Sequence, residues 1–209
     1  MNQKQIIDIS PIVSSRLAVF PGDEHFHRQV SMDMNKGDNI TLSSITSTVH
    51  IGAHTDAPSH YSKDGETIDQ RSLDMYLGPC QVIRVDHLQA GERIYPKDLD
   101  GVKILAPRVL FCTNSFHEEK WTEDFNSLSP ELIEYLHKKG TVLVGIDTPS
   151  VDPASSKDLE SHAALRRFDL AVLEGILLNH VNEGLYTLVA LPLKLEGADA
   201  SPVRAVLLS

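Results

Sequence analysis

Short apolar runs rich in β-branched residues recur along the chain and are typical of β-strands. They occupy residues 40–49, 81–85, 108–112, 141–146, 186–193 and 203–208. The run TVLVGI at residues 141–146 is apolar at nearly every position, which indicates a strand covered on both faces of its sheet. The run at residues 40–49 leads into a polar motif.

The pattern also predicts two helices. The first begins after Ser129, a capping residue, has Pro130 at its first position and ends at Gly140. The apolar residues between these signals share one face. A second helix is predicted at residues 162–178. Because strands outnumber helices, we expect one α/β domain over residues 1–209, with a mixed, barrel-like sheet and few helices.

Composition narrows the classes of partner. At 209 residues and 41% hydrophobic content, the chain can bury one full core. A net charge of −10 argues against nucleic acid or an anionic membrane as partner. No apolar run approaches the ~18 residues of a membrane span. Cys80 and Cys112 are too few for a disulfide framework, so the expected location is the cytoplasm, with reduced thiols.

The stretch VHIGAHTDAPSH, residues 49–60, holds three histidines and one aspartate: His50, His54, Asp56 and His60. These four side chains would repel one another or leave polar atoms unpaired unless a cation binds between them. Zinc binds imidazole nitrogen and carboxylate oxygen at ~2.0–2.2 Å, so the donor atoms must converge. A helix would turn Asp56 away from the histidines, and a straight strand would separate His50 from His54 by ~13 Å.

A strand that bends at Gly52 resolves this conflict, because glycine adopts the dihedrals of a sharp turn. Pro58 then stiffens the exit and directs His60 back toward the site. Three ligands leave open positions on the metal, which suits catalysis. His60 is then a candidate general acid or base, with a role as fourth ligand as the alternative.

The second half of the site is expected within residues 145–175. His162 and Glu174 are candidates for a second metal, with Asp56 or Glu174 bridging. The residues alone do not decide this, because other acids are equally available: Asp147, Asp152, Asp158, Glu160 and Asp169. The histidines outside the motif are interpreted as surface or satisfied core residues: His25, His27, His87, His117, His137 and His180.

Several segments together carry a family resemblance. The spacing His50-x3-His54-x-Asp56-x3-His60, then SLDMYLGPCQVI, GIDTPSVDPASSKDLESH, LEG and ALPLKLEGADASPVRAVL, resembles the bacterial kynurenine formamidases. These arylformamidases belong to the cyclase family of metal-dependent hydrolases. The likeness runs from DISP near residue 8 to the last predicted strand. It implies a swivelling β/β/α fold, a homodimer and two zinc ions per subunit.

The resemblance also implies residue roles. It assigns His60 as proton donor and acceptor, and it assigns the zinc ligands as His50, His54, Asp56, His162 and Glu174, with both carboxylates shared. One position departs from the family, which usually has tryptophan before Pro-Gly-Asp as a substrate contact, whereas this chain has Phe20. Phenylalanine can stack on an aryl ring but lacks the indole N–H. A plain Pro-Gly turn with a core aromatic is the alternative.

The activity implied is hydrolysis of N-formyl-L-kynurenine to L-kynurenine and formate, a step of tryptophan degradation through kynurenine. The partner is then a small molecule. A related alternative is another family amidohydrolase, such as an isatin-type lactam hydrolase. A mononuclear iron oxygenase could use His50, His54 and Asp56 and would not need Glu174. In a non-catalytic metal-binding module, His60 would be dispensable.

Overall fold

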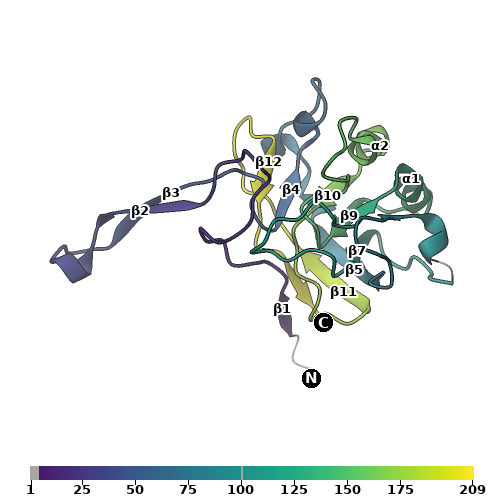
Figure 1. Ribbon diagram of the computed structural model, residues 1–209, viewed down its shortest axis with the longest axis horizontal. Helices are drawn as coiled ribbons and strands as arrows, with labels where there is room; N and C mark the ends of the chain where they lie inside the picture. The colour runs from purple at the N-terminus through teal and green to yellow at the C-terminus, as the bar shows by residue number, and fades with distance from the viewer. Residues whose placement is uncertain (1–4, 100) are drawn as a thin grey trace.

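The computed structural model describes residues 5–99 and 101–209. Within these residues, its main element is a seven-stranded sheet curled into a half barrel (Figure 1). Its strands are β1 (Ile6–Asp8), β5 (Leu77–Arg84), β7 (Arg108–Cys112), β9 (Leu143–Ile146), β10 (Ala171–Leu173), β11 (Gly184–Val189) and β13 (Val206–Leu208). They lie in the order β1-β13-β11-β5-β7-β9-β10.

The sheet is mixed, as expected. Strands β5, β7, β9 and β10 run parallel to one another, whereas β1, β13, β11 and β5 pair antiparallel. The prediction of a mixed α/β fold with a barrel-like sheet and few helices is therefore confirmed. Strand β7 has the predicted bounds, and the other predicted strands are shifted by a few residues.

Two apolar cores lie on opposite faces of the sheet. In β7, Val109 and Phe111 belong to the core under the helices, while Leu110 and Cys112 belong to the other core. Side chains alternate between faces along a strand, so a strand covered on both sides is apolar at successive positions. This explains why the central runs are continuous rather than alternating.

Helices α1 (Pro130–Lys138) and α2 (Glu160–Phe168) cover one face of the sheet (Figure 1). The start of α1 is as predicted, because Ser129 Oγ accepts a hydrogen bond from Leu132 N at 3.1 Å and Pro130 follows. The second helix prediction, residues 162–178, is wrong beyond Phe168. Asp169 adopts a left-handed conformation that ends α2, and the next apolar residues form β10 beside β9.

Three further strand pairs complete the strands of the described chain: β2 (His27–Met32) with β3 (Leu42–Thr46), β4 (His54–Asp56) with β12 (Ala200–Pro202), and β6 (Arg93–Ile94) with β8 (Ser127–Leu128). The β2–β3 hairpin, called the arm below, extends far from the rest of the fold (Figure 1). Strand β3 is shorter than the strand predicted at residues 40–49.

Short 3₁₀ helices η1 to η5 join the strands, at Met34–Lys36, Pro58–His60, Ile68–Gln70, Leu73–Met75 and Pro96–Leu99. No helix in the described part of the chain has the length and apolar character needed to cross a membrane.

Candidate functional site

The predicted bend lies at Gly52, which has a φ of 59°. The chain turns there and enters β4 at His54. A neighbouring segment makes this turn crowded: a Cβ on Gly175 would lie 2.2 Å from the Gly52 carbonyl oxygen. The two segments therefore approach backbone to backbone, which only glycine permits.

This approach pairs His54 with Glu174. His54 N donates to Glu174 O at 3.1 Å, and Glu174 N donates to His54 O at 2.9 Å. Glu174 directly follows β10, so the pair links the bent motif to the parallel edge of the large sheet. Two segments 120 residues apart in the sequence thus bring their side chains to one point.

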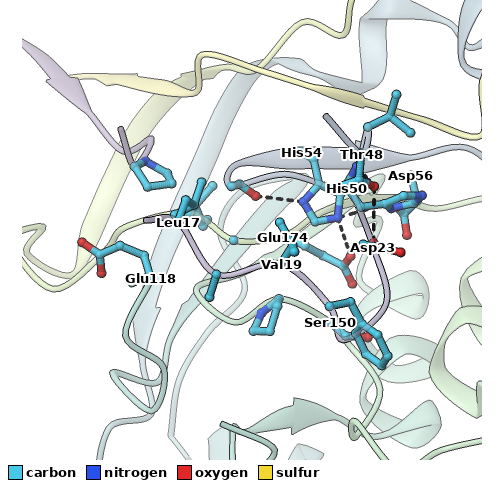
Figure 2. Close-up of a pocket in the computed structure, with 18 of the residues that line it drawn as sticks. Leu17, Val19, Asp23, Thr48, His50, His54, Asp56, Glu118, Ser150 and Glu174 are labelled. Carbon is cyan, nitrogen blue, oxygen red and sulfur yellow. Dashed lines mark hydrogen bonds and ion pairs between the residues drawn. The ribbon is translucent and has the colours of Figure 1, made fainter. Parts of the chain in front are cut away.

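The first group of possible ligands is His50, His54 and Asp56 (Figure 2). His50 Nδ1 lies 2.9 Å from Asp56 Oδ1, and His54 Nε2 lies 3.5 Å from the same oxygen. Glu174 Oε2 is 3.2 Å from His54 Nε2. Ligand atoms held tetrahedrally at ~2.1 Å from an ion stand roughly 3.4 Å apart, so these separations fit an ion between them.

The second group is Asp56, His162 and Glu174, all of them buried. His162 lies in the first turn of α2, and its Nε2 is 3.4 Å from Asp56 Oδ2 and 3.7 Å from Glu174 Oε1. Each carboxylate therefore presents one oxygen to each group. The structure brings all five predicted ligands together in two adjoining clusters.

Two buried polar atoms in these clusters lack a hydrogen-bond partner among the described residues. They are Asp56 Oδ1 in the first group and His162 Nε2 in the second, because their contacts of 2.9 Å and 3.4 Å described above do not have hydrogen-bond geometry. A buried polar group left unpaired costs about 1–3 kcal/mol, and more when it is charged. A cation bound in each group would satisfy both atoms, so the residues present fit a metal.

The outward nitrogen of each clustered histidine is also engaged. His54 Nδ1 is 2.8 Å from the Gly52 carbonyl oxygen, and His162 Nδ1 is 2.8 Å from Asp152 Oδ2. Asp152 also accepts hydrogen bonds from the Ser161 and His162 main-chain nitrogens. Such partners fix ring orientation and leave the inward nitrogen free for a metal.

Protonation in the metal-free site follows from this crowding. Burial lowers the pKa of His50, but the Asp56 and Asp199 carboxylates raise it by more, to about 9. Burial also lowers the pKa of His162, while the Asp152 and Asp56 carboxylates raise it to about 10. Burial raises the pKa of Asp56, yet the adjacent histidines hold it well below its usual range. Without a cation, protons on the histidines therefore balance the buried carboxylates.

His60 lies beside these clusters rather than inside them. It ends the 3₁₀ turn that Pro58 begins, and its Nδ1 is 3.2 Å from Asp199 Oδ2. Its ring centroid is 4.2 Å from that of His50 and 6.0 Å from that of His162. His50, His60 and Asp199 form a third, partly exposed group that could hold an ion.

A cavity of about 560 Å³ opens above the clusters. Its lining includes His50, His54, Asp56, His60, His162 and Glu174, together with apolar residues from the N-terminal segment. Phe20 lines this cavity and is 44% exposed. Its ring meets Trp121 edge-on, with the ring centroids 5.0 Å apart. Phe20 is thus a wall residue of the cavity, and its contact with a substrate stays a prediction.

The remaining acids of residues 145–175 either have other partners or are exposed. Asp147 accepts hydrogen bonds from Thr113 and Asn114. Glu160 and Asp169 form ion pairs with Arg93 and Arg71, and Asp158 is exposed. Within the described chain, no group that could hold an ion contains one of the six histidines interpreted as surface or core residues.

Two site residues were not identified from the sequence, Asp152 and Asp199. Asp152 was one of five equivalent acids, and its position ten residues before His162 in a loop gives no periodic signal. Asp199 lies 139 residues from His60 and is placed by the pairing of β12 with β4. Only a prediction of that long-range pairing could have found it.

The fold and its buried histidine–carboxylate clusters define an α/β protein with a site able to hold metal. The family model described as putative cyclase matches residues 7–153. The chain belongs to this cyclase family, so the resemblance inferred from the sequence is confirmed.

Relatives match along nearly the whole chain. The kynurenine formamidase of Bordetella pertussis is 47% identical over 206 residues, covering 98% of each chain. That of Delftia acidovorans is 44% identical over 205 residues, covering 98% of this chain and 97% of its own.

Solved structures share the fold. A structure described as a potential metal-dependent hydrolase with cyclase activity has a TM-score of 0.84 at 28% identity, covering 99% of this chain and 98% of that one. Isatin hydrolase A from Labrenzia aggregata has a TM-score of 0.84 at 20% identity, covering 98% and 93%. At that identity the likeness concerns the fold alone.

Proposed function

We propose that this protein is a metal-dependent arylformamidase that hydrolyses N-formyl-L-kynurenine to L-kynurenine and formate in tryptophan degradation. Two relatives named kynurenine formamidase, at 44–47% identity over nearly the full chain, support the substrate. The observation that carries the chemistry is the pair of shared carboxylates. Asp56 and Glu174 each direct one carboxylate oxygen toward the first histidine group and the other oxygen toward the second.

The proposed cofactor is two zinc ions per subunit. The side chains that would hold them are His50, His54, Asp56, His162 and Glu174. Nitrogen and carboxylate oxygen donors suit zinc, and the unpaired atoms Asp56 Oδ1 and His162 Nε2 support one ion in each group. Zinc bound there would polarise the formyl carbonyl and lower the pKa of a water molecule.

The chain's own residues then position the substrate and move a proton. His60 accepts the proton of the water that adds to the formyl carbon. It returns this proton to the aryl nitrogen as the carbon–nitrogen bond breaks, which releases formate and the free amine. An unprotonated anilide is a poor leaving group, so proton donation is needed. Phe20 would pack on the aryl ring, and a 560 Å³ cavity suits a substrate of this size.

A substrate comparison tests this proposal. The zinc-loaded protein, assayed without oxygen, should release formate and L-kynurenine from N-formyl-L-kynurenine much faster than it opens isatin. Faster opening of isatin would identify the protein as a lactam hydrolase. A requirement for oxygen and one iron ion would identify an oxygenase.

Metal analysis tests the two-ion site. Elemental analysis should find about two zinc ions per chain, and Glu174→Gln should lose at least one of them. Glu118→Gln is the matched control, because Glu118 lines the same cavity outside the ion-holding groups of the described chain. Unchanged zinc in Glu174→Gln would contradict the shared-carboxylate site.

The proposal includes a homodimer, and the arm supports it. Five large apolar side chains are exposed on the arm: Val30, Met34, Ile40, Leu42 and Ile45. An isolated two-stranded hairpin is marginal in water, and exposed apolar patches commonly mark interfaces. Reciprocal packing of two arms across a two-fold axis would cover both copies.

Two further parts of the proposal concern the chain as a whole. Residues 1–209 would form one domain, which is supported by apolar cores on both faces of a single sheet. The proposed location is the cytoplasm, which is supported by Cys80 and Cys112 being free and buried.

A further inference from the structure

One carboxylate oxygen contacts both His50 and His60. Asp199 Oδ2 lies 2.9 Å from His50 Nε2 and 3.2 Å from His60 Nδ1, within hydrogen-bond distance of each. An ionised carboxylate only accepts hydrogen bonds, so both of these ring nitrogens must carry a proton. For a neutral ring, such a contact selects one tautomer, with the proton on the nitrogen that faces Asp199.

The two selected tautomers are opposite, and each suits a different task. His50 with its proton on Nε2 has its lone pair on Nδ1, the atom that lies 2.9 Å from Asp56 Oδ1 in the first ligand group. His60 with its proton on Nδ1 has its lone pair on Nε2, and this residue lines the cavity. One ring is then ready to bind an ion, and the other is ready to accept a proton.

The main chain of Asp199 is held against the motif. Ala57 N donates to Asp199 O at 2.8 Å, and the next residue, Ala200, pairs with Asp56 where β12 meets β4. The main chain that carries this carboxylate is therefore fixed relative to the strand that carries His54 and Asp56. A fixed acceptor can define ring orientation, whereas a mobile surface carboxylate cannot.

We propose that Asp199 is a positioning residue that sets the tautomers of His50 and His60 at once, and so couples the first metal group to the proton-transfer group. This inference rests on the proposed function, which gives the two histidines their tasks. Loss of such an outer partner typically lowers metal affinity or activity about 10–100-fold.

The competing interpretation is that Asp199 binds an ion itself. The ligand atoms of His50, His60 and Asp199 lie within 4.8 Å of one another, which is close enough for a third site. The two interpretations differ in what happens to zinc stoichiometry when Asp199 is changed. If Asp199 positions the two rings, its removal lowers zinc affinity and changes their tautomers. If Asp199 is a ligand, its removal lowers the number of bound ions.

The variants are Asp199→Ala and Asp199→Asn, with Glu196→Gln as the matched control. Glu196 is an exposed acid of the same loop, so its variant removes one charge three residues away. In Asp199→Ala we expect kcat and zinc affinity each to fall about 10–100-fold, with two zinc ions still bound at saturation. Asp199→Asn keeps an acceptor oxygen and nearly the same shape, so its losses of kcat and zinc affinity should be smaller. It also tests the role of Asp199 if the alanine variant folds poorly.

A double-variant cycle separates the two effects of Asp199. In a His60→Ala background, Asp199→Ala should cost little further kcat, because its catalytic effect acts through His60. Its effect on zinc affinity should persist, because that effect acts through His50. Equal kcat losses with and without His60, together with unchanged zinc affinity, would overturn the proposal.

Long-range ¹H–¹⁵N spectra of the histidine rings in the zinc-loaded protein give a readout that is independent of the substrate. His60 should carry its proton on Nδ1, and Asp199→Ala should move it toward Nε2. An unchanged tautomer in that variant, or loss of one zinc equivalent, would reject a positioning role. If the protein does not hydrolyse N-formyl-L-kynurenine, the proposed function fails, and these spectra and the zinc affinities still decide the role of Asp199.

Discussion

Replacing Gly175 with alanine should separate the two halves of the metal site. A Cβ at this position would lie 2.2 Å from the Gly52 carbonyl oxygen, and real Cβ contacts are essentially never below 3.0 Å. The bent motif and the segment after β10 must therefore move apart by about 0.8 Å or more. That movement would break the two backbone hydrogen bonds between His54 and Glu174.

The structure sets the size of this effect. Gly175 has a φ of 64°, where a residue with a Cβ costs about 1–2 kcal/mol. Each lost backbone hydrogen bond adds about 0.5–1.5 kcal/mol, so the variant should be destabilised by roughly 2–5 kcal/mol. Functional sites tolerate displacements of only about 0.5 Å, so zinc content and activity should fall as well.

Gly140→Ala is the matched control for this prediction. Gly140 also has a left-handed φ, of 85°, but nothing lies within 4 Å of its added Cβ. Gly140→Ala should therefore be destabilised only by the about 1–2 kcal/mol that a Cβ costs at a left-handed φ, and it should keep its zinc. Urea unfolding of the metal-free proteins measures the free energy of unfolding, and elemental analysis measures zinc. If Gly175→Ala matched Gly140→Ala in both, the close backbone approach would not organise the site.

The other predictions concern separate parts of the molecule. His60→Ala should retain zinc and lower kcat on formanilides about 10²–10⁴-fold. Its kcat on formyl aryl esters should fall much less, because a phenolate leaves unaided, and loss of zinc would make His60 a ligand. Phe20→Ala should raise KM several-fold, on the scale of ~0.5–1.5 kcal/mol of aromatic contact, and an unchanged KM with a large drop in Tm would assign Phe20 to the core. The metal-free protein should lose stability as pH rises from 6.5 through about 10, because the folded pKa of His162 is raised above its unfolded value of 6.5. Zinc should abolish this loss of stability in thermal melts, and an equal loss with zinc would contradict the prediction. Ile45→Asp on the arm should give monomers by light scattering, whereas Leu105→Asp outside the arm should leave a dimer; the side chains of Ile45 and Leu105 are 67% and 63% exposed. Unchanged dimers in both variants would exclude the arm as the dimer interface.

The sequence predicted those features whose cause lies within a few residues. The bend at Gly52 followed from the need of the motif's donor atoms to converge, and Gly52 does adopt a left-handed φ. The start of α1 followed from Ser129 and Pro130, and the capping hydrogen bond is present. In both cases the deciding interactions are local, so the pattern of residue types contains them.

The sequence did not predict features that depend on distant pairing. The run LAVL at residues 170–173 is short and apolar, and periodicity does not distinguish a buried strand from a helix at that length. Its pairing with β9 decides the outcome. Likewise β2, with the sequence HRQVSM, has no strong strand pattern and is defined by its partner β3. Asp199 reaches His60 only because β12 pairs with β4.

The packing of the cavity wall around Phe20 bears on the tryptophan that the family resemblance implies at this position. The sequence contains one tryptophan, Trp121, whose ring meets Phe20 at 5.0 Å and Phe116 at 6.0 Å between centroids. Phe20 and Phe116 line the cavity, and Trp121 meets both rings edge-on. Edge-to-face packing holds the Phe20 ring in place, so it can stack on a substrate ring at little cost in side-chain freedom. Phe20 itself offers no hydrogen-bond donor, so the substrate contact proposed at this position would rest on ring contact alone.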